Sequence, residues 1–240
     1  MVIANMDKAQ IFTPIKLNKE KLAVLVIDRI KDALIRGQLK PGDKLPAIAD
    51  LAAELNVGIS SVREAIKMLE ALCVVECRHG GRTVICSELK EDSINPLTYQ
   101  LLILPKNSKD LIEFREMFES AYTFMAMDNA SDSDMENIRL IVESQKEKDK
   151  TLELIDQDEM DFHRAILHST HNKYVIKIGE TMLELLLGTF QKWTIPKHEY
   201  TGIKVIESHI SIYEALKTKN KTKLHNALNE SYRGWRMKFF

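Results

Sequence analysis

A carboxylate and two histidines in the second half of this 240-residue chain have the types and spacing of a metal site. Glu159 and His163 are four residues apart, which puts them on one face of a helix. His209, on a later predicted helix, can supply a third ligand. Neutral imidazoles with one carboxylate suit zinc, nickel or manganese. A Glu–His pair at this spacing is also an ordinary surface interaction, so spacing alone leaves both interpretations open.

Arg115 is a candidate for binding a small carboxylate ligand. Its planar guanidinium presents two parallel N–H groups that match the two oxygens of a carboxylate. The alternative is a structural ion pair with Glu119, four residues further along the same predicted helix. The two interpretations carry equal weight at this point.

Small polar and basic side chains in the first half of the chain have the types that contact DNA. They are expected on the outward face of a helix whose apolar positions are Val62, Ile66 and Leu69. Basic side chains bind phosphates and base edges, and hydroxyls bind either. The alternative is that the basic residues only form the solvated face of this helix. The candidates are Ser60, Ser61, Arg63 and Lys67.

The elements that carry these DNA-contact candidates are predicted to be three helices and a hairpin. Apolar residues at four-residue steps indicate the first helix, and a short turn joins the second to the third. Two short strands flank a turn with two glycines. This order predicts a winged helix-turn-helix domain over residues 19–87, after an N-terminal extension over 1–18. The predicted elements are helices over 22–34 and 47–55, a third helix capped by Ser60 or Ser61, strands over 74–77 and 82–85, and a helix-turn-helix at about 47–66.

From residue 88 onward the pattern is helical, with few glycines and apolar residues spaced by three and four. About six or seven helices fit this length. Ser133–Glu136 has the pattern of a capping box that opens one helix, and Asn172 can cap another. We therefore expect a mainly α protein, with a linker helix over 88–107 and an all-helical domain over 108–240.

Composition narrows the class of protein. The three cysteines, Cys73, Cys77 and Cys86, are odd in number and lack the partners of a zinc site, which favours a reduced cytoplasm. No apolar run is long enough to span a bilayer. The net charge is −1, but residues 1–85 carry 13 Lys and Arg against 10 Asp and Glu. Any affinity for DNA must therefore come from local placement of charge in this first part.

Residues 22–85 resemble the DNA-binding domain of GntR-type regulators. The resemblance is carried by Gly37–Pro46, by Asp50-Leu51-Ala52 and by Val62-Arg63-Glu64-Ala65-Ile66, with the wing glycines after them. It implies that family DNA-contact positions are occupied here by Ser60, Ser61, Arg63, His79 and Gly80.

Two arginines that such regulators usually have are replaced here by Ala49 and Ile59. Arginine reads guanine through a bidentate contact worth about 1–3 kcal/mol of discrimination. Their absence predicts an operator that differs from the usual family half-site. Ile59 can instead contact the methyl group of a thymine.

Residues 110–235 resemble the helical effector-binding domain of the FadR-like branch of these regulators, the FCD domain. The matching residues are Arg115 with Glu119, the segment 161–166, Asn172, and the segment around His209. The resemblance implies that Arg115 lies in an effector cavity. It also implies metal ligands at Glu159, His163 and His209, with Ser231 where many members have a third histidine. A metal would then have three protein ligands and water, or the pocket would be metal-free.

These observations favour a homodimeric transcription regulator, in keeping with palindromic operators. We expect a ligand-responsive repressor that binds operator DNA and a small carboxylate, with a divalent metal in the helical domain. One alternative is a DNA-binding dimer whose helical domain only joins two subunits. A metal-dependent enzyme is the weakest alternative, because no nucleophile or second carboxylate cluster accompanies Glu159.

Overall fold

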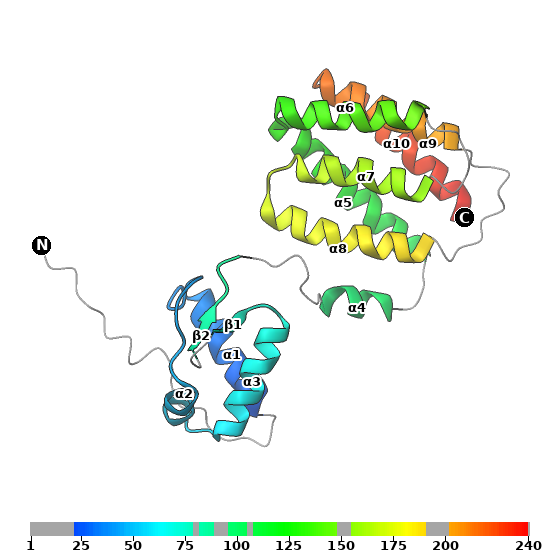
Figure 1. The fold of residues 1–240 in the computed structure, drawn as a ribbon. Coiled ribbons are helices and arrows are strands. Elements are labelled where there is room, and N and C mark those ends of the chain that lie inside the picture. Colours follow the sequence, from blue (N-terminus) through cyan, green and yellow to red (C-terminus); the bar gives the residue numbers. More distant parts are fainter. Residues whose placement is uncertain are drawn as a thin grey trace, which may run out of the picture. The chain divides into compact units, whose positions relative to one another are not determined.

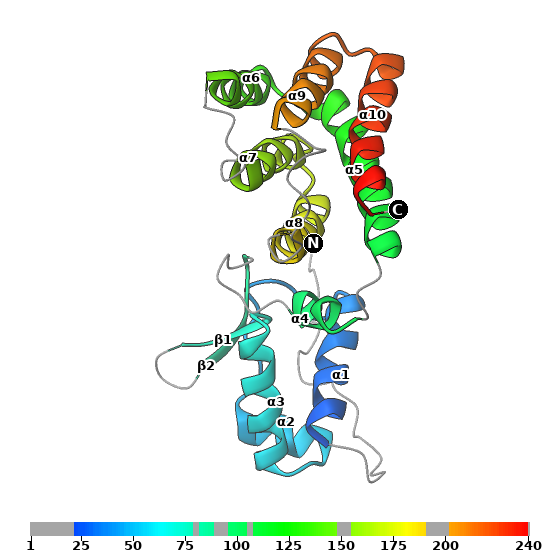
Figure 2. The ribbon, with the colours of Figure 1, turned by 90° about the vertical axis from the view of Figure 1, so that its right-hand side faces the viewer.

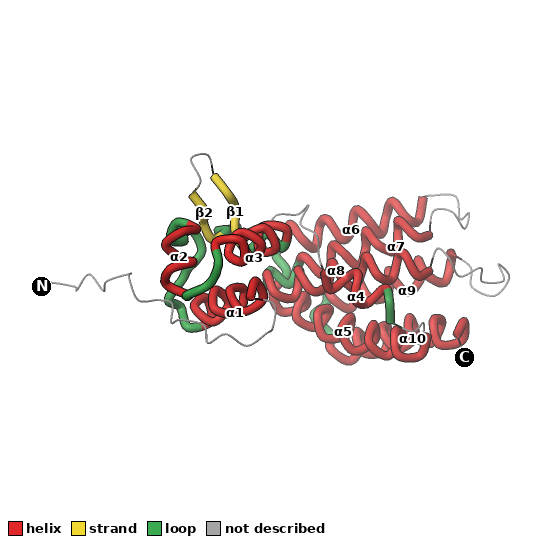
Figure 3. The backbone as a smooth tube through the Cα atoms, turned by 90° about the horizontal axis from the view of Figure 1, so that it is seen from below, coloured by secondary structure: helices red, strands yellow, loops and turns green. Residues whose placement is uncertain are grey.

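The computed structural model describes residues 22–78, 82–88, 96–104, 108–147, 155–190 and 202–239. The chain divides into two compact units, residues 1–96 and residues 97–240. The described elements are helical apart from one hairpin (Figure 3), which confirms the expected mainly α fold. Within the described part of the chain, no helix has the length and apolar character of a membrane span.

The first unit is a winged helix-turn-helix. Its helices are α1 (Leu22–Ile35), α2 (Ile48–Leu55) and α3 (Ile59–Ala71), and its wing consists of β1 (Val75–Arg78) and β2 (Arg82–Ile85), as labelled in Figure 1. The strands are antiparallel, with Val75 opposite Ile85 and Arg78 opposite Arg82. Both α1 and α2 pack against α3, and β1 follows α3 directly. This order fixes the wing beside the third helix.

The third helix has the predicted apolar face but a different start. Val62, Ile66 and Leu69 are buried, as expected. The prediction that Ser60 or Ser61 caps α3 is wrong, because the N-cap is Gly58 and no side chain caps this end. The Gly58 carbonyl accepts hydrogen bonds from the N–H groups of Ser61 and Val62, so the first turn closes one residue before Ile59. Both serines therefore lie inside the helix.

The second unit is a bundle of helices. Among the described residues there are seven, within the six or seven expected. In Figures 1 and 2, α7 lies between α6 and α8, and α10 lies alongside α5. Helix α9 packs against α6, α7 and α10. The helices are α4 (Pro96–Leu102), α5 (Ser108–Asn129), α6 (Asp132–Glu147), α7 (Ile155–His168), α8 (Lys173–Phe190), α9 (Gly202–Lys217) and α10 (Lys221–Phe239).

The starts of α6 and α8 are capped by side chains. The predicted capping box at Ser133–Glu136 is wrong, because the box forms two residues earlier. The Ser131 N–H donates to Asp134 Oδ2 at 2.8 Å, and the Asp134 N–H donates to Ser131 Oγ at 3.2 Å. Aspartate thus takes the place usually held by glutamate. The prediction that Asn172 caps a helix is confirmed, since its Oδ1 accepts from two N–H groups at the start of α8.

Candidate functional site

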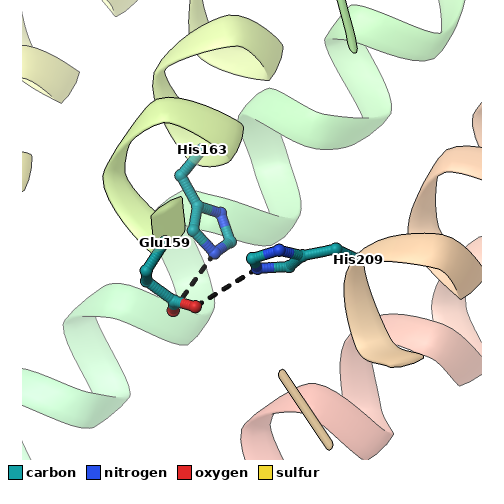
Figure 4. A group of neighbouring side chains, drawn as sticks. All are labelled: Glu159, His163 and His209. Carbon is teal, nitrogen blue, oxygen red and sulfur yellow. Dashed lines mark ion pairs between the residues drawn. The ribbon is translucent and has the colours of Figure 1, made fainter. Parts of the chain in front are cut away.

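Helices α7 and α9 bring together the three residues that the sequence singled out as metal ligands (Figure 4). Glu159 and His163 lie one turn apart on α7, and His209 projects from α9. Glu159 Oε1 is 3.3 Å from His163 Nε2, and Glu159 Oε2 is 3.2 Å from His209 Nε2. The three potential ligand atoms all lie within 4.8 Å of one another. One ion can reach all three donors.

A ring stack holds His209 in this position. Phe162, fully buried on α7, stacks on the His209 ring with a centroid distance of 3.9 Å and an interplanar angle of 18°. Because Phe162 is next to His163 in the chain, the same turn of α7 presents one ligand and supports another. Both histidines are almost completely buried.

The surroundings favour the protonation states that metal binding needs. Burial by itself would raise the pKa of Glu159, but His163, His209 and Arg115 together hold it well below its ordinary value. Burial lowers the pKa of His209, although Glu159 opposes this. Near neutral pH the site therefore contains an ionised carboxylate and a neutral His209, which are the forms that coordinate metals.

The residues present fit a divalent metal. A carboxylate oxygen and two imidazole nitrogens are a set that zinc, nickel and manganese accept. Glu159, His163 and His209 would hold the ion, which would supply a positive charge and an open coordination position. Ser231 is buried on α10, whereas His225 on the same helix is exposed and hydrogen-bonded to Asn229. His225 therefore does not supply the third histidine that is missing at position 231.

Arg115 is buried on α5 between two carboxylates. Its Nε donates to Glu119 Oε2 at 2.8 Å, and its Nη2 donates to Glu159 Oε1 at 2.6 Å. The same Nη2 lies 3.3 Å from His163 Nε2. Burial alone would lower the pKa of Arg115, but Glu119 and Glu159 raise it. The structure thus contains the ion pair with Glu119 and adds a second one with the candidate metal ligand.

Three residues near the site were not picked out by sequence reasoning as partners of the histidines. Glu119 Oε1 is buried 3.3 Å from His163 Nδ1, and the Tyr122 hydroxyl lies 3.4 Å from the same nitrogen. Gln145 Oε1 is 2.8 Å from His209 Nδ1. The i, i+4 spacing to Arg115 and the family motif marked Glu119, but no spacing in the sequence marked Tyr122 or Gln145.

The candidate DNA contacts lie on one surface of α3. Ser60, Arg63 and Lys67 are exposed, and Ser61 is half-buried. Ile59, at the start of the same helix, is 46% exposed although it is apolar. His79 and Gly80, at the predicted wing tip, lie outside the described residues.

Comparison with known proteins gives family matches for both units. Residues 22–85 match the model for bacterial regulatory proteins of the gntR family, and residues 110–234 match the FCD domain. The chain is 29% identical to the HTH-type transcriptional regulator LutR of Bacillus subtilis, over 80% of this chain and 89% of that protein. It is 24% identical to the HTH-type transcriptional repressor NanR of Klebsiella aerogenes, over 88% of this chain and 83% of that one.

A solved structure shares the fold. The chain is similar to a GntR protein of Streptococcus agalactiae, with a TM-score of 0.56 and 19% sequence identity. The similarity covers 90% of this chain and 99% of the other.

Proposed function

The chain belongs to the gntR family of bacterial regulatory proteins and carries an FCD domain, and from this we propose that a divalent metal and a small carboxylate control its binding to DNA. It is a ligand-responsive, DNA-binding transcription regulator. The proposal concerns the ligands, the residues that bind them and the direction of control. Since the NanR relatives are named repressors, we propose that this protein represses transcription. We also propose that it acts in the cytoplasm.

The convergence of Glu159, His163 and His209 is the observation that carries this proposal. Three protein ligands leave at least one position of a tetrahedral or octahedral ion for another ligand. A carboxylate oxygen of an effector suits this position, because a divalent cation attracts an anion strongly in a buried site. The site in this proposal binds and does not catalyse.

Arg115 supports a carboxylate as the effector. Its Nη2 contacts both Glu159 and His163, so it lies at the edge of the proposed coordination sphere. If Glu159 held a metal ion, its ion pair with Arg115 would be weaker. The guanidinium would then have a donor to offer to a second carboxylate, that of the effector.

The DNA-binding unit supports recognition by α3 in the major groove. Residues near the N-terminus of such a helix meet base edges, and those further along bind the phosphate backbone. We propose that Ser60, Ser61 and Arg63 contact base edges of the operator and that Lys67 contacts its phosphate backbone. The wing residues His79 and Gly80 are proposed as further DNA contacts. Two subunits bound as a homodimer would read a palindromic site.

The test begins with selection of binding sites from random double-stranded DNA by the full chain. Fluorescence anisotropy then measures affinity for the selected site, with Zn²⁺, Ni²⁺ or Mn²⁺ and small carboxylates added separately and together. We expect one combination to change the affinity by about 5- to 150-fold, the usual range for coupling between two sites. His163→Ala should abolish the response, and the exposed control His225→Ala should keep it.

The alternative is a DNA-binding dimer with a ligand-free helical domain. Two observations favour it: Ser231 is not a histidine, and the Arg115 side chain is already paired with two carboxylates. It predicts tight DNA binding that no metal or carboxylate changes. That result would contradict the proposal.

A further inference from the structure

Gln145 connects the backbone beside one proposed metal ligand to the ring of another. It lies on α6 and is 1% exposed. Its Nε2 donates to the backbone carbonyl of Asp158 at 2.8 Å, and its Oε1 lies 2.8 Å from His209 Nδ1. Asp158 immediately precedes Glu159 in α7. A single buried amide therefore links α6, α7 and α9.

The hydrogen-bond roles along this chain follow from one fixed partner. A backbone carbonyl oxygen can only accept, so the amide nitrogen of Gln145 must face Asp158. The amide oxygen must then face His209. Because an amide oxygen can only accept, His209 Nδ1 must carry the hydrogen. Glu159 Oε2, 3.2 Å from Nε2, is a more distant acceptor than Gln145 Oε1, 2.8 Å from Nδ1, so in a neutral imidazole we place the hydrogen on Nδ1 and the lone pair on Nε2.

The surroundings of His163 do not settle its tautomer in the same way. Its Nδ1 faces Glu119 Oε1 and the Tyr122 hydroxyl, and a hydroxyl can donate as well as accept. His163 Nε2 faces both Arg115, which can only donate, and Glu159 Oε1, which can only accept. Of the two histidines, His209 has the ring nitrogen with the shorter hydrogen bond, and its partner, Gln145, has a fixed role as acceptor.

We propose that Gln145 is a positioning residue that selects the His209 tautomer able to bind a metal through Nε2. The inference rests on the proposed metal site, because the choice of tautomer matters when a metal binds. The tautomer itself is inferred from the hydrogen bonds of Gln145. Gln145 acts only through His209 and does not touch the ion. Partners of this kind fix the ring orientation of a ligating histidine and raise its basicity.

Two substitutions separate positioning from packing. Gln145→Met keeps nearly the same length but accepts no strong hydrogen bond. Gln145→Glu keeps an acceptor for His209 Nδ1–H and loses the donor to Asp158. The exposed glutamine of α7, Gln157, provides the matched control Gln157→Met.

The first measurement is calorimetric titration of Zn²⁺ into the full-length variants, with circular dichroism to verify folding. We expect Gln145→Met to weaken zinc binding by about 10- to 100-fold, the usual cost of losing such a partner. Gln145→Glu should bind zinc more tightly than Gln145→Met. A merely structural role predicts the reverse order, because an added buried carboxylate disturbs packing more than methionine does. Finding that reverse order would overturn the inference.

The second measurement needs no metal. Histidine ring ¹⁵N shifts of the metal-free chain report which nitrogen of His209 carries the hydrogen. We expect Nδ1–H in the wild type and in Gln145→Glu, and a mixture of tautomers in Gln145→Met. Nε2–H in the wild type would overturn the inference. A wild type with the Nδ1–H tautomer but no zinc binding would instead contradict the proposed metal function and leave the role of Gln145 supported.

Discussion

At the scale of single residues, Arg115 carries a buried charge in the helical unit. Its side chain is 4% exposed and paired with Glu119 and Glu159. Removing one partner of a buried ion pair leaves an uncompensated charge, which costs about 3–5 kcal/mol. We therefore expect Arg115→Met to lower the free energy of unfolding by this amount, as measured by urea denaturation at neutral pH.

Arg139 provides the control for this substitution. It is also paired with two carboxylates, Glu136 and Glu143, but its side chain is 35% exposed. Pairs of this kind contribute little in water. Arg139→Met should leave the urea midpoint nearly unchanged, and equal losses in the two variants would contradict the role given to burial.

The exposure of the Ile59 side chain leads to a prediction about the operator. An exposed apolar side chain at the start of α3, the proposed recognition helix, suits the methyl group of a thymine. Replacing the contacted dT by deoxyuridine removes only that methyl and should weaken binding by about 0.8 kcal/mol, or about fourfold. Deoxyuridine scanning of the selected operator should reveal one such position in each half-site. The Ile59→Ala variant should bind both DNAs equally, and a wild type insensitive at every position would rule the contact out.

The residues of the candidate site could be predicted to different degrees. Glu159 and His163 could be paired from sequence because i, i+4 proximity is a local property of a helix. Arg115 could be identified, but its second carboxylate could not, since Glu159 lies on another helix. The role of Gln145 could not be predicted either, because its contact with His209 depends on how α6, α7 and α9 pack.

At the scale of elements, the N-terminus of α6 depends on the Ser131–Asp134 capping box. Burial alone would raise the pKa of Asp134, but hydrogen bonds from Ser131 and His171 lower it below its ordinary value of 3.8. The ionised carboxylate therefore stabilises the fold above that pH, and the stabilisation is lost as the pH falls through the lowered pKa. Asp134→Asn should be less stable than wild type at neutral pH.

Urea midpoints measured over a descending pH series test this sign. The difference between wild type and Asp134→Asn should shrink as the pH falls below 3.8. A difference that stays constant or grows in acid would show that the Asp134 charge does not stabilise the cap.

The contact between α7 and α8 depends on a glycine. A Cβ added at Gly179 would lie 2.4 and 2.5 Å from the two Cδ atoms of Leu167, which is completely buried. Alanine usually stabilises a helix interior relative to glycine by about 1 kcal/mol. Here overpacking should reverse the sign, and we expect Gly179→Ala to destabilise the protein by about 1–3 kcal/mol in thermal or urea unfolding.

A double-mutant cycle isolates this contact. In a Leu167→Ala background the obstructing atoms are gone, so Gly179→Ala should cost less than it does in the wild type. Equal costs in both backgrounds would show that α7 and α8 move apart without strain.

Element boundaries show where sequence patterns are ambiguous. Residues 131–136 contain two overlapping signals, Ser131 with Asp134 and Ser133 with Glu136. The glutamate version is the commoner capping box, but the helix begins where Asp134 can reach back to the Ser131 N–H. The buried face of α3 was easier to predict, because its apolar periodicity extends over several turns.

At the scale of the whole molecule, we propose that one unit binds DNA and the other binds the ligands. The proposed DNA contacts lie on α3, and the proposed ligand site lies within the helical bundle. A ligand changes DNA affinity only if it binds two global states of the protein with different affinities. The proposed metal and carboxylate would supply this difference by replacing the contact between Arg115 and Glu159.

Metal binding by the full-length chain tests the central claim most directly. Metal analysis of the purified protein, with calorimetric titration of Zn²⁺, Ni²⁺ and Mn²⁺ into the stripped protein, should give one ion per chain. His163→Ala should lose that ion, whereas His225→Ala should keep it. An excess of metal at about 100 times its dissociation constant should also stabilise the wild type by about 2.7 kcal/mol. Absence of binding, or binding that survives the loss of His163, would contradict the claim that Glu159, His163 and His209 form a metal site.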